Sequence, residues 1–143
     1  MGYTHYWRQL QQVDADKFSA FTKKVALIVK TADEAGIPLG NSGGEGTPEI
    51  TDSVIALNGF AQFGRESFII ELGEDFSFCK TGQAPYDCVV TAILILLKAE
   101  LGSAYSVSSD GSWDDWTEGR NLYAETFGVE AEESEVFSSV QAN

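Results

Sequence analysis

The sequence predicts a single α+β domain in which three helices pack on a mainly antiparallel β-sheet. The expected order of elements is strand, helix, three strands, helix, strand, helix, which is not the regular alternation that builds a parallel sheet. Hydrophobic residues make up 43% of the 143 residues, enough for one packed core. We therefore expect one domain over residues 1–128, followed by an acidic tail over residues 129–143.

The first half of the chain begins with a strand and a long helix. The segment 3–9 (YTHYWRQ) is rich in aromatic residues, which favours a strand. Asp14 is expected to cap a helix that ends at Gly36, because apolar residues between them recur at three- and four-residue spacing. Beyond Gly36 the expected elements are a Gly-, Pro- and Ser-rich loop over 37–49 and strands near 50–58 and 66–72.

A strand over 76–80 is expected to lead through a turn at Gly82 into a second helix. Pro85 opens this helix, a favoured place for proline because its missing N–H would be unpaired there. The stretch CVVTAILILLKA is apolar on nearly every side, which is typical of a helix in the middle of a domain. Gly102 ends the helix.

This strand–turn–helix junction is the first candidate ligand site. The amides and the dipole of a helix start attract anions. Lys80 adds a positive charge, and Thr81 and Tyr86 supply hydroxyl donors, with Asp87 at the helix start. The alternative is structural: Asp87 only favours the helix dipole, and Lys80 only pairs with an acid. The GxxxxGK[ST] pattern of a nucleotide-binding loop is missing, and no cofactor is expected.

A second junction follows at SSDGSWDDW. A strand over 104–109 turns at Asp110-Gly111, and Ser112 and Asp115 resemble a capping box that starts a third helix. The residues of this junction assigned to the ligand site are Ser109, Asp110 and Trp113. The acids here do not match a calcium-loop pattern, so no metal site is predicted.

The opening strand is the third candidate. Tyr3, His5 and Trp7 share one face of the strand and are assigned to the ligand site. His5 is the single histidine, and a histidine among aromatic residues is more often a packing residue than a general base. No Ser-His-Asp or Cys-His spacing is recognised in the sequence, so no catalytic residue is predicted.

The balance of charged residues limits the classes of partner that the protein is expected to bind. Nine Lys and Arg face 22 Asp and Glu, a formal net charge of −13. Such a chain is repelled by phosphate backbones, so direct binding of nucleic acid is not expected. The charge serves solubility or, alternatively, mimics nucleic acid toward a basic protein. Mimicry requires the acids on one face, whereas solubility spreads them.

Cysteine usage and hydropathy bear on location. No secretory signal is recognised at the start of the sequence, which favours a reducing cytoplasm and free thiols at Cys79 and Cys88. Their spacing does not indicate a metal site. The longest apolar run is too short to span a bilayer, so no membrane partner is expected.

Three motifs together resemble a family of small uncharacterised proteins encoded in bacterial and phage genomes. These are GYTHYW at the start, FCKT followed after three residues by PYD, and SSDGSW. The resemblance covers most of the chain up to about Gly128. It implies an intracellular protein, in the host cytoplasm if a phage encodes it. It implies no established activity and no catalytic residues.

Three functional hypotheses remain. The first is a non-enzymatic domain that binds a small anionic, nucleotide-like molecule and, if phage-borne, sequesters a host nucleotide signal. The second is an acidic interaction module that blocks a basic partner, with a protein partner or homo-oligomer implied. The third is a hydrolase or transferase on a phosphorylated substrate, for which His5 or Asp87 would be the base.

Overall fold

Strand β1 (Thr4–Gln9) is the centre of a three-stranded sheet in the computed structural model, which describes residues 2–137. It lies between β6 (Phe76–Lys80) and β7 (Tyr105–Ser109) and runs antiparallel to both. A second antiparallel sheet is built on β4 (Val54–Gly59), whose partners are β2 (Leu39–Gly40), β3 (Glu49–Ile50) and β5 (Phe68–Glu71). The expected α+β class with a mainly antiparallel sheet is confirmed.

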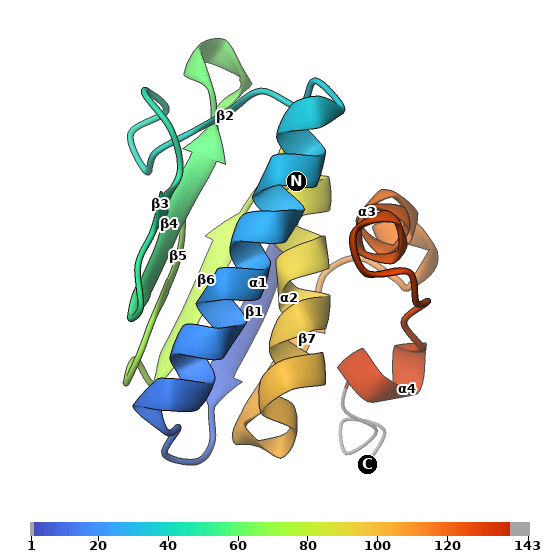
Figure 1. The fold of residues 1–143 in the computed structure, drawn as a ribbon. Coiled ribbons are helices and arrows are strands. Elements are labelled where there is room, and N and C mark those ends of the chain that lie inside the picture. The colour runs from blue at the N-terminus through green and yellow to red at the C-terminus, as the bar shows by residue number, and fades with distance from the viewer. Residues whose placement is uncertain (1, 138–143) are drawn as a thin grey trace.

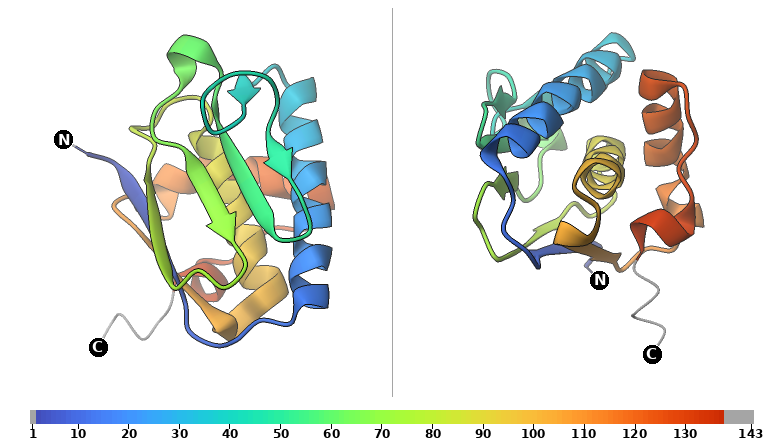
Figure 2. Two further views of the ribbon diagram at one scale, coloured as in Figure 1. Left: turned by 90° about the vertical axis from the view of Figure 1, so that its left-hand side faces the viewer. Right: turned by 60° about the horizontal axis from the view of Figure 1, so that its bottom comes forward.

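The helices enclose α2 (Asp87–Leu101). Helix α1 (Ala15–Glu34) lies beside it over the sheets, and α3 (Thr117–Phe127) and the short α4 (Glu133–Val136) lie on its other side (Figures 1 and 2). Eleven of the residues of α2 are buried, which confirms the prediction of a central helix. Within residues 2–137, no helix has both the length and the apolar character needed to cross a membrane.

The helix ends follow the local chemistry. The Asp14 side chain accepts a hydrogen bond from the Asp16 amide at the start of α1. Gly36 and Gly102 adopt positive φ angles just beyond α1 and α2. Helix α2 begins at Asp87 rather than at Pro85, because residues 81–86 form two successive turns before the helical hydrogen bonds start.

Two further segments differ from the sequence-based expectation. The strand expected over 50–58 is two strands, β3 and β4, because the Thr51 hydroxyl accepts from the Ser53 and Val54 amides and closes a hairpin turn. In the segment expected to be a tail, Val136 is buried in the core and Phe137 packs edge-on against Trp116. Residues 129–137 therefore pack on the domain, and the rest of that segment lies outside the described residues.

Candidate functional site

The three sequence motifs meet at one end of the three-stranded sheet, where β1 starts. Because β6 and β7 run antiparallel to β1, their ends lie beside its start. His5 is opposite Cys79 on one side and Ser109 on the other. Helix α2 and the segment before α3 both start at this end of the sheet. The motifs GYTHYW, FCKTGQAPYD and SSDGSW therefore come together there.

His5 is fully buried and hydrogen-bonded through both ring nitrogens. Its Nδ1 lies 2.7 Å from the Ser109 hydroxyl oxygen, and its Nε2 lies 2.7 Å from Asp87 Oδ1. The ring also meets Tyr3 and Trp116 edge to face, with centroids 5.1 and 5.2 Å away. The imidazole is therefore held in a single orientation.

The hydrogen bonds of Ser109 determine which nitrogen of the neutral ring carries the proton. The Ser109 oxygen accepts from the Gly111 amide at 2.9 Å and from the Trp116 indole N–H at 3.2 Å. A hydroxyl has two lone pairs and one hydrogen, so its hydrogen points to His5 Nδ1. His5 Nε2 then carries the proton and donates a hydrogen bond to Asp87. The donors of the whole network thus converge on the Asp87 carboxylate.

Asp87 is held from two sides and still reaches the surface. Its Oδ1 accepts from His5 and from the Thr81 hydroxyl, and its side chain is 14% exposed. The carboxylate lines a hollow of about 700 Å³ between the turn before α2 and the start of α3. The other acidic residues that line this hollow are Asp114, Asp115 and Glu118. Its charge is therefore strongly negative.

Tyr3 adds a hydrogen-bond donor at the same end of the sheet. Its hydroxyl is buried without a hydrogen-bond partner among the described residues. Burial, followed by the nearby charges of Asp87, Asp115 and Asp110, raises the pKa of Tyr3 to about 12. The phenol consequently keeps its proton at neutral pH.

The structure brings together most of the residues assigned to the ligand site from the sequence. His5, Thr81, Asp87 and Ser109 form the hydrogen-bond network, and Tyr3 packs edge to face against His5. Asp110 lies at its border, where one carboxylate oxygen accepts from the Thr4 amide and the other from the Tyr6 hydroxyl.

Four assigned residues lie apart from this network. Trp7 is buried against Phe68, and the Tyr86 hydroxyl is buried and donates to the Glu66 carbonyl. Trp113 packs under the Arg120 guanidinium, 4.7 Å from the ring centroid.

Lys80 is a separate case. The strand over 3–9 does lie beside it, because Thr4 is its partner in the β1–β6 register. The Lys80 side chain is nevertheless exposed on the face of the sheet opposite to Cys79 and His5, because successive side chains of a strand alternate. Lys80 therefore does not share a hollow with Asp87.

The sequence reasoning missed three residues of the site. Gly111 and Trp116 donate to Ser109, and Gly119 lines the hollow next to α2. Only Gly119 carries a signal in the sequence, because a glycine inside a helix usually marks a close approach.

Ser109, His5 and Asp87 are hydrogen-bonded in the same order as the serine, histidine and aspartate of a catalytic triad. The spacing of these residues in the sequence did not reveal this arrangement. The environment differs from that of a nucleophile. Both Ser109 lone pairs accept N–H groups, so neither is free to attack a substrate. The Ser112 amide, which could serve an oxyanion, donates to Asp115. The network is therefore suited to hold Asp87 rather than to activate Ser109.

The cysteines and acids give little support to other chemistries. Burial raises the pKa of the Cys79 thiol to about 12 and that of Cys88 to about 11, so both stay protonated near neutral pH. Among residues 2–137, no group of three or more His, Cys, Asp or Glu side chains is placed to hold a metal ion.

Comparison of the chain with protein-family models, with curated proteins and with solved structures finds no significant match. The resemblance to small bacterial and phage proteins therefore stays a prediction.

Proposed function

We propose that the protein is a non-enzymatic domain that binds a small molecule through the Asp87 carboxylate. The observation that carries this proposal is that His5 and Thr81 both donate hydrogen bonds to Asp87, which lines an open hollow. Binding sites commonly fix a contacting group through a buried second layer of hydrogen bonds, as His5 and Ser109 do here.

The chemistry of the hollow defines the ligand group. Asp87, Asp114, Asp115 and Glu118 repel phosphate and attract hydrogen-bond donors or positive charge. An amine fits, and so does the amino-substituted edge of a nucleobase. A nucleotide-like ligand, as expected from the sequence, would place its base at Asp87 and its phosphates outside the hollow. That the ligand as a whole is anionic stays a prediction.

Replacing Asp87 with asparagine is expected to weaken ligand binding by about 10- to 100-fold, since a lost charge-assisted hydrogen bond is worth about 1.5–3 kcal/mol. Asn keeps an oxygen that can accept from His5 and Thr81. The measurement is a thermal-shift screen with nucleosides, their nucleotides, cyclic dinucleotides and polyamines, followed by calorimetry on each compound that shifts the melting temperature.

The matched control is Asp33→Asn, which removes the same charge from an exposed position on α1 that does not line the hollow. It should leave binding unchanged. Pairs such as adenosine and AMP separate recognition of the base from recognition of the phosphate. A compound that binds Asp87→Asn as tightly as the parent protein, or a screen without any binder, would contradict the proposal.

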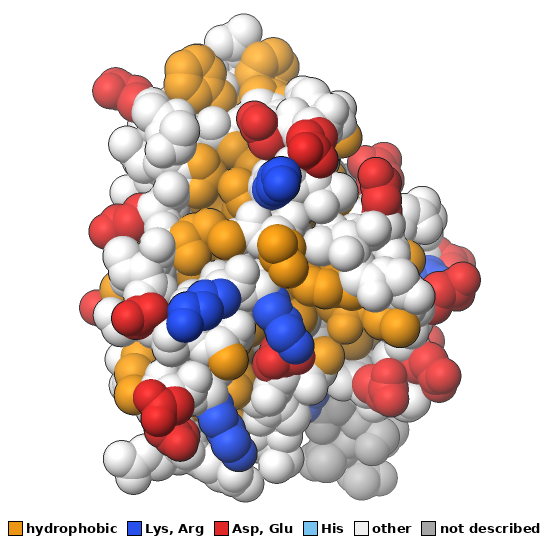
Figure 3. Space-filling model, in the orientation of Figure 1, with side chains coloured by type: hydrophobic (Ala, Val, Ile, Leu, Met, Phe, Trp, Pro, Cys, Tyr) orange, Lys and Arg blue, Asp and Glu red, His pale blue; other side chains and the backbone are white. Residues whose placement is uncertain are grey.

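The distribution of charge favours a second candidate, the acidic interaction module. Residues 110–135 hold nine acidic residues and one basic residue, Arg120, a net −8 out of −13 for the chain. This segment covers the α3–α4 side, whereas four of the nine Lys and Arg residues lie on α1, which faces the viewer in Figure 3. Net negative charge is thus concentrated in this segment while 13 of the 22 acids lie outside it, and such a concentration suits a basic protein partner.

Neutralising four acids of this side to glutamine should weaken binding to a small basic protein such as lysozyme more than a matched set elsewhere does. The test set is Glu125, Glu130, Glu132 and Glu133, and the control set is Asp16, Asp33, Glu49 and Glu71, all exposed. Calorimetry at low and high salt is the measurement. Equal losses in both sets would show that only total charge matters and would remove this candidate.

A further inference from the structure

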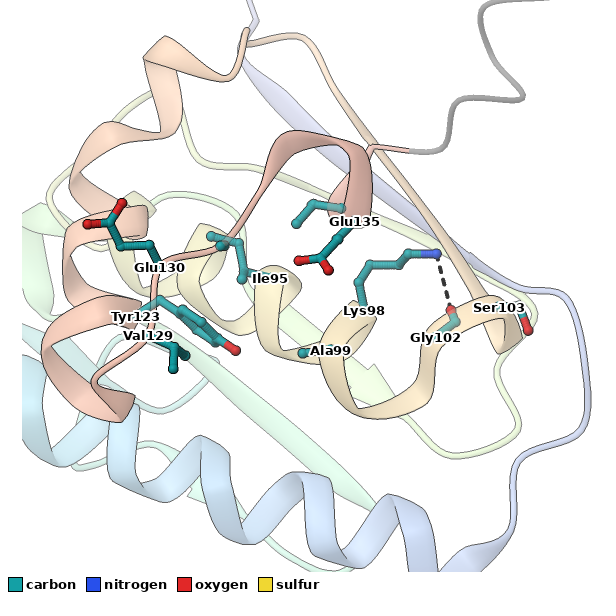
Figure 4. A pocket seen from close by; sticks show the side chains of 11 residues that line it. Ile95, Lys98, Ala99, Gly102, Ser103, Tyr123, Val129, Glu130 and Glu135 are labelled. Atoms are coloured by element: carbon teal, nitrogen blue, oxygen red, sulfur yellow. Dashed lines mark hydrogen bonds between the residues drawn. The ribbon is translucent and has the colours of Figure 1, made fainter.

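A second hollow lies at the opposite end of α2 from Asp87. It has a volume of about 590 Å³ and opens between the last turns of α2 and the segment from α3 to α4 (Figure 4). Its apolar lining residues are Ile95, Ala99, Val129, Ala131 and Val136. We call it the Lys98 cleft, because Lys98 is the one basic residue that lines it.

Lys98 has one hydrogen-bond donor left for a ligand. Its ammonium donates to the Gly102 carbonyl at 3.1 Å and to the Tyr105 carbonyl at 2.8 Å. An ammonium has three donors, so the third has no acceptor within residues 2–137. Within the described residues, Lys98 forms no ion pair with a carboxylate. Burial lowers the pKa of Lys98, because desolvation disfavours its charged form.

Two carboxylates line the same cleft. Figure 4 shows Glu135 next to Lys98 and Glu130 at the far end of the cleft, beyond Ile95 and Tyr123. Both glutamates are exposed. The cleft therefore presents a positive pole and a negative pole along an apolar wall. A simple anion would meet two carboxylates, and a simple cation would meet Lys98.

We propose that the Lys98 cleft binds a small zwitterion, namely an α-amino acid with an aliphatic side chain. The ligand carboxylate accepts from the third N–H of Lys98. The ligand ammonium faces Glu135, because the two charged groups of an α-amino acid share one carbon, and the ligand side chain covers the apolar wall. This site is independent of the ligand proposed for Asp87, because the two hollows share no lining residue.

The test is an NMR titration of the ¹⁵N-labelled protein with leucine at neutral pH. Amide signals of the last turns of α2 and of α4 should shift and saturate. Leucinamide lacks the carboxylate and N-acetylleucine lacks the ammonium, so each should bind at least about 10-fold more weakly. Absence of saturable shifts with leucine, or equal binding of the three compounds, would overturn the proposal.

Two variants test whether leucine binding depends on the positive charge of Lys98 and on the negative charge of Glu135. Lys98→Gln should abolish the leucine-dependent shifts, but it also removes hydrogen bonds to the end of α2. Glu135→Gln is therefore the second variant, because Glu135 is exposed; it should weaken leucine binding without lowering the melting temperature. Glu125→Gln is the control on the outside of α3. Asp87→Asn should leave leucine binding unchanged, which separates this site from the first.

Discussion

Replacing His5 with alanine is expected to lower the free energy of unfolding by about 3–5 kcal/mol. The change removes the partner of the Asp87 carboxylate and of the Ser109 hydroxyl. It also opens a cavity where a fully buried ring stood between Tyr3 and Trp116. Urea unfolding followed by circular dichroism at pH 7 measures the effect.

Smaller changes in the same network should cost less, in a defined order. Ser109→Ala leaves the Gly111 amide, the Trp116 indole and His5 Nδ1 without their shared partner and should cost about 1–3 kcal/mol. Asp87→Asn keeps an acceptor for His5 and should cost least. If His5→Ala unfolds at the same urea concentration as the parent protein, the network does not support the site and the proposal for Asp87 loses its basis.

The elements that the sequence predicted well are those set by local chemistry. The spacing of apolar residues and the Asp14 cap located α1, and the all-round apolar run located α2. The hydrogen bonds of the capping box are present, because the Ser112 amide donates to Asp115 and the Asp115 amide approaches the Ser112 hydroxyl, but they precede a 3₁₀ turn over Asp114–Trp116 and α3 begins only at Thr117. Each of these interactions joins residues a few positions apart, so a single sequence contains all the information needed.

The site depends on pairings that local chemistry does not fix. His5 is 82 residues from Asp87 and 104 residues from Ser109, and only the β1–β6 and β1–β7 registers bring them together. The residue types could be named from the motifs, but their contacts could not. The same limit explains Lys80, whose backbone lies beside β1 while strand alternation turns its side chain to the other face.

Replacing Gly119 with alanine is expected to destabilise the protein by about 3 kcal/mol. A Cβ at this position would lie 1.7 Å from the Thr91 hydroxyl oxygen and 3.1 Å from the Cys88 carbonyl oxygen. Thr91 is fully buried and donates to backbone carbonyls of α2, so it cannot simply move aside. The measurement is again urea unfolding of the parent and the variant.

The sign of this effect is decisive, because glycine to alanine inside a helix normally stabilises by up to about 1 kcal/mol. A more stable Gly119→Ala protein would mean that α3 does not approach α2 so closely, and the hollow between Asp87 and Glu118 would then be wider than described. Thr91→Ala removes the closest clashing atom. The double variant should therefore be more stable than the sum of the two single changes predicts, and strict additivity would show that Thr91 and Gly119 do not touch.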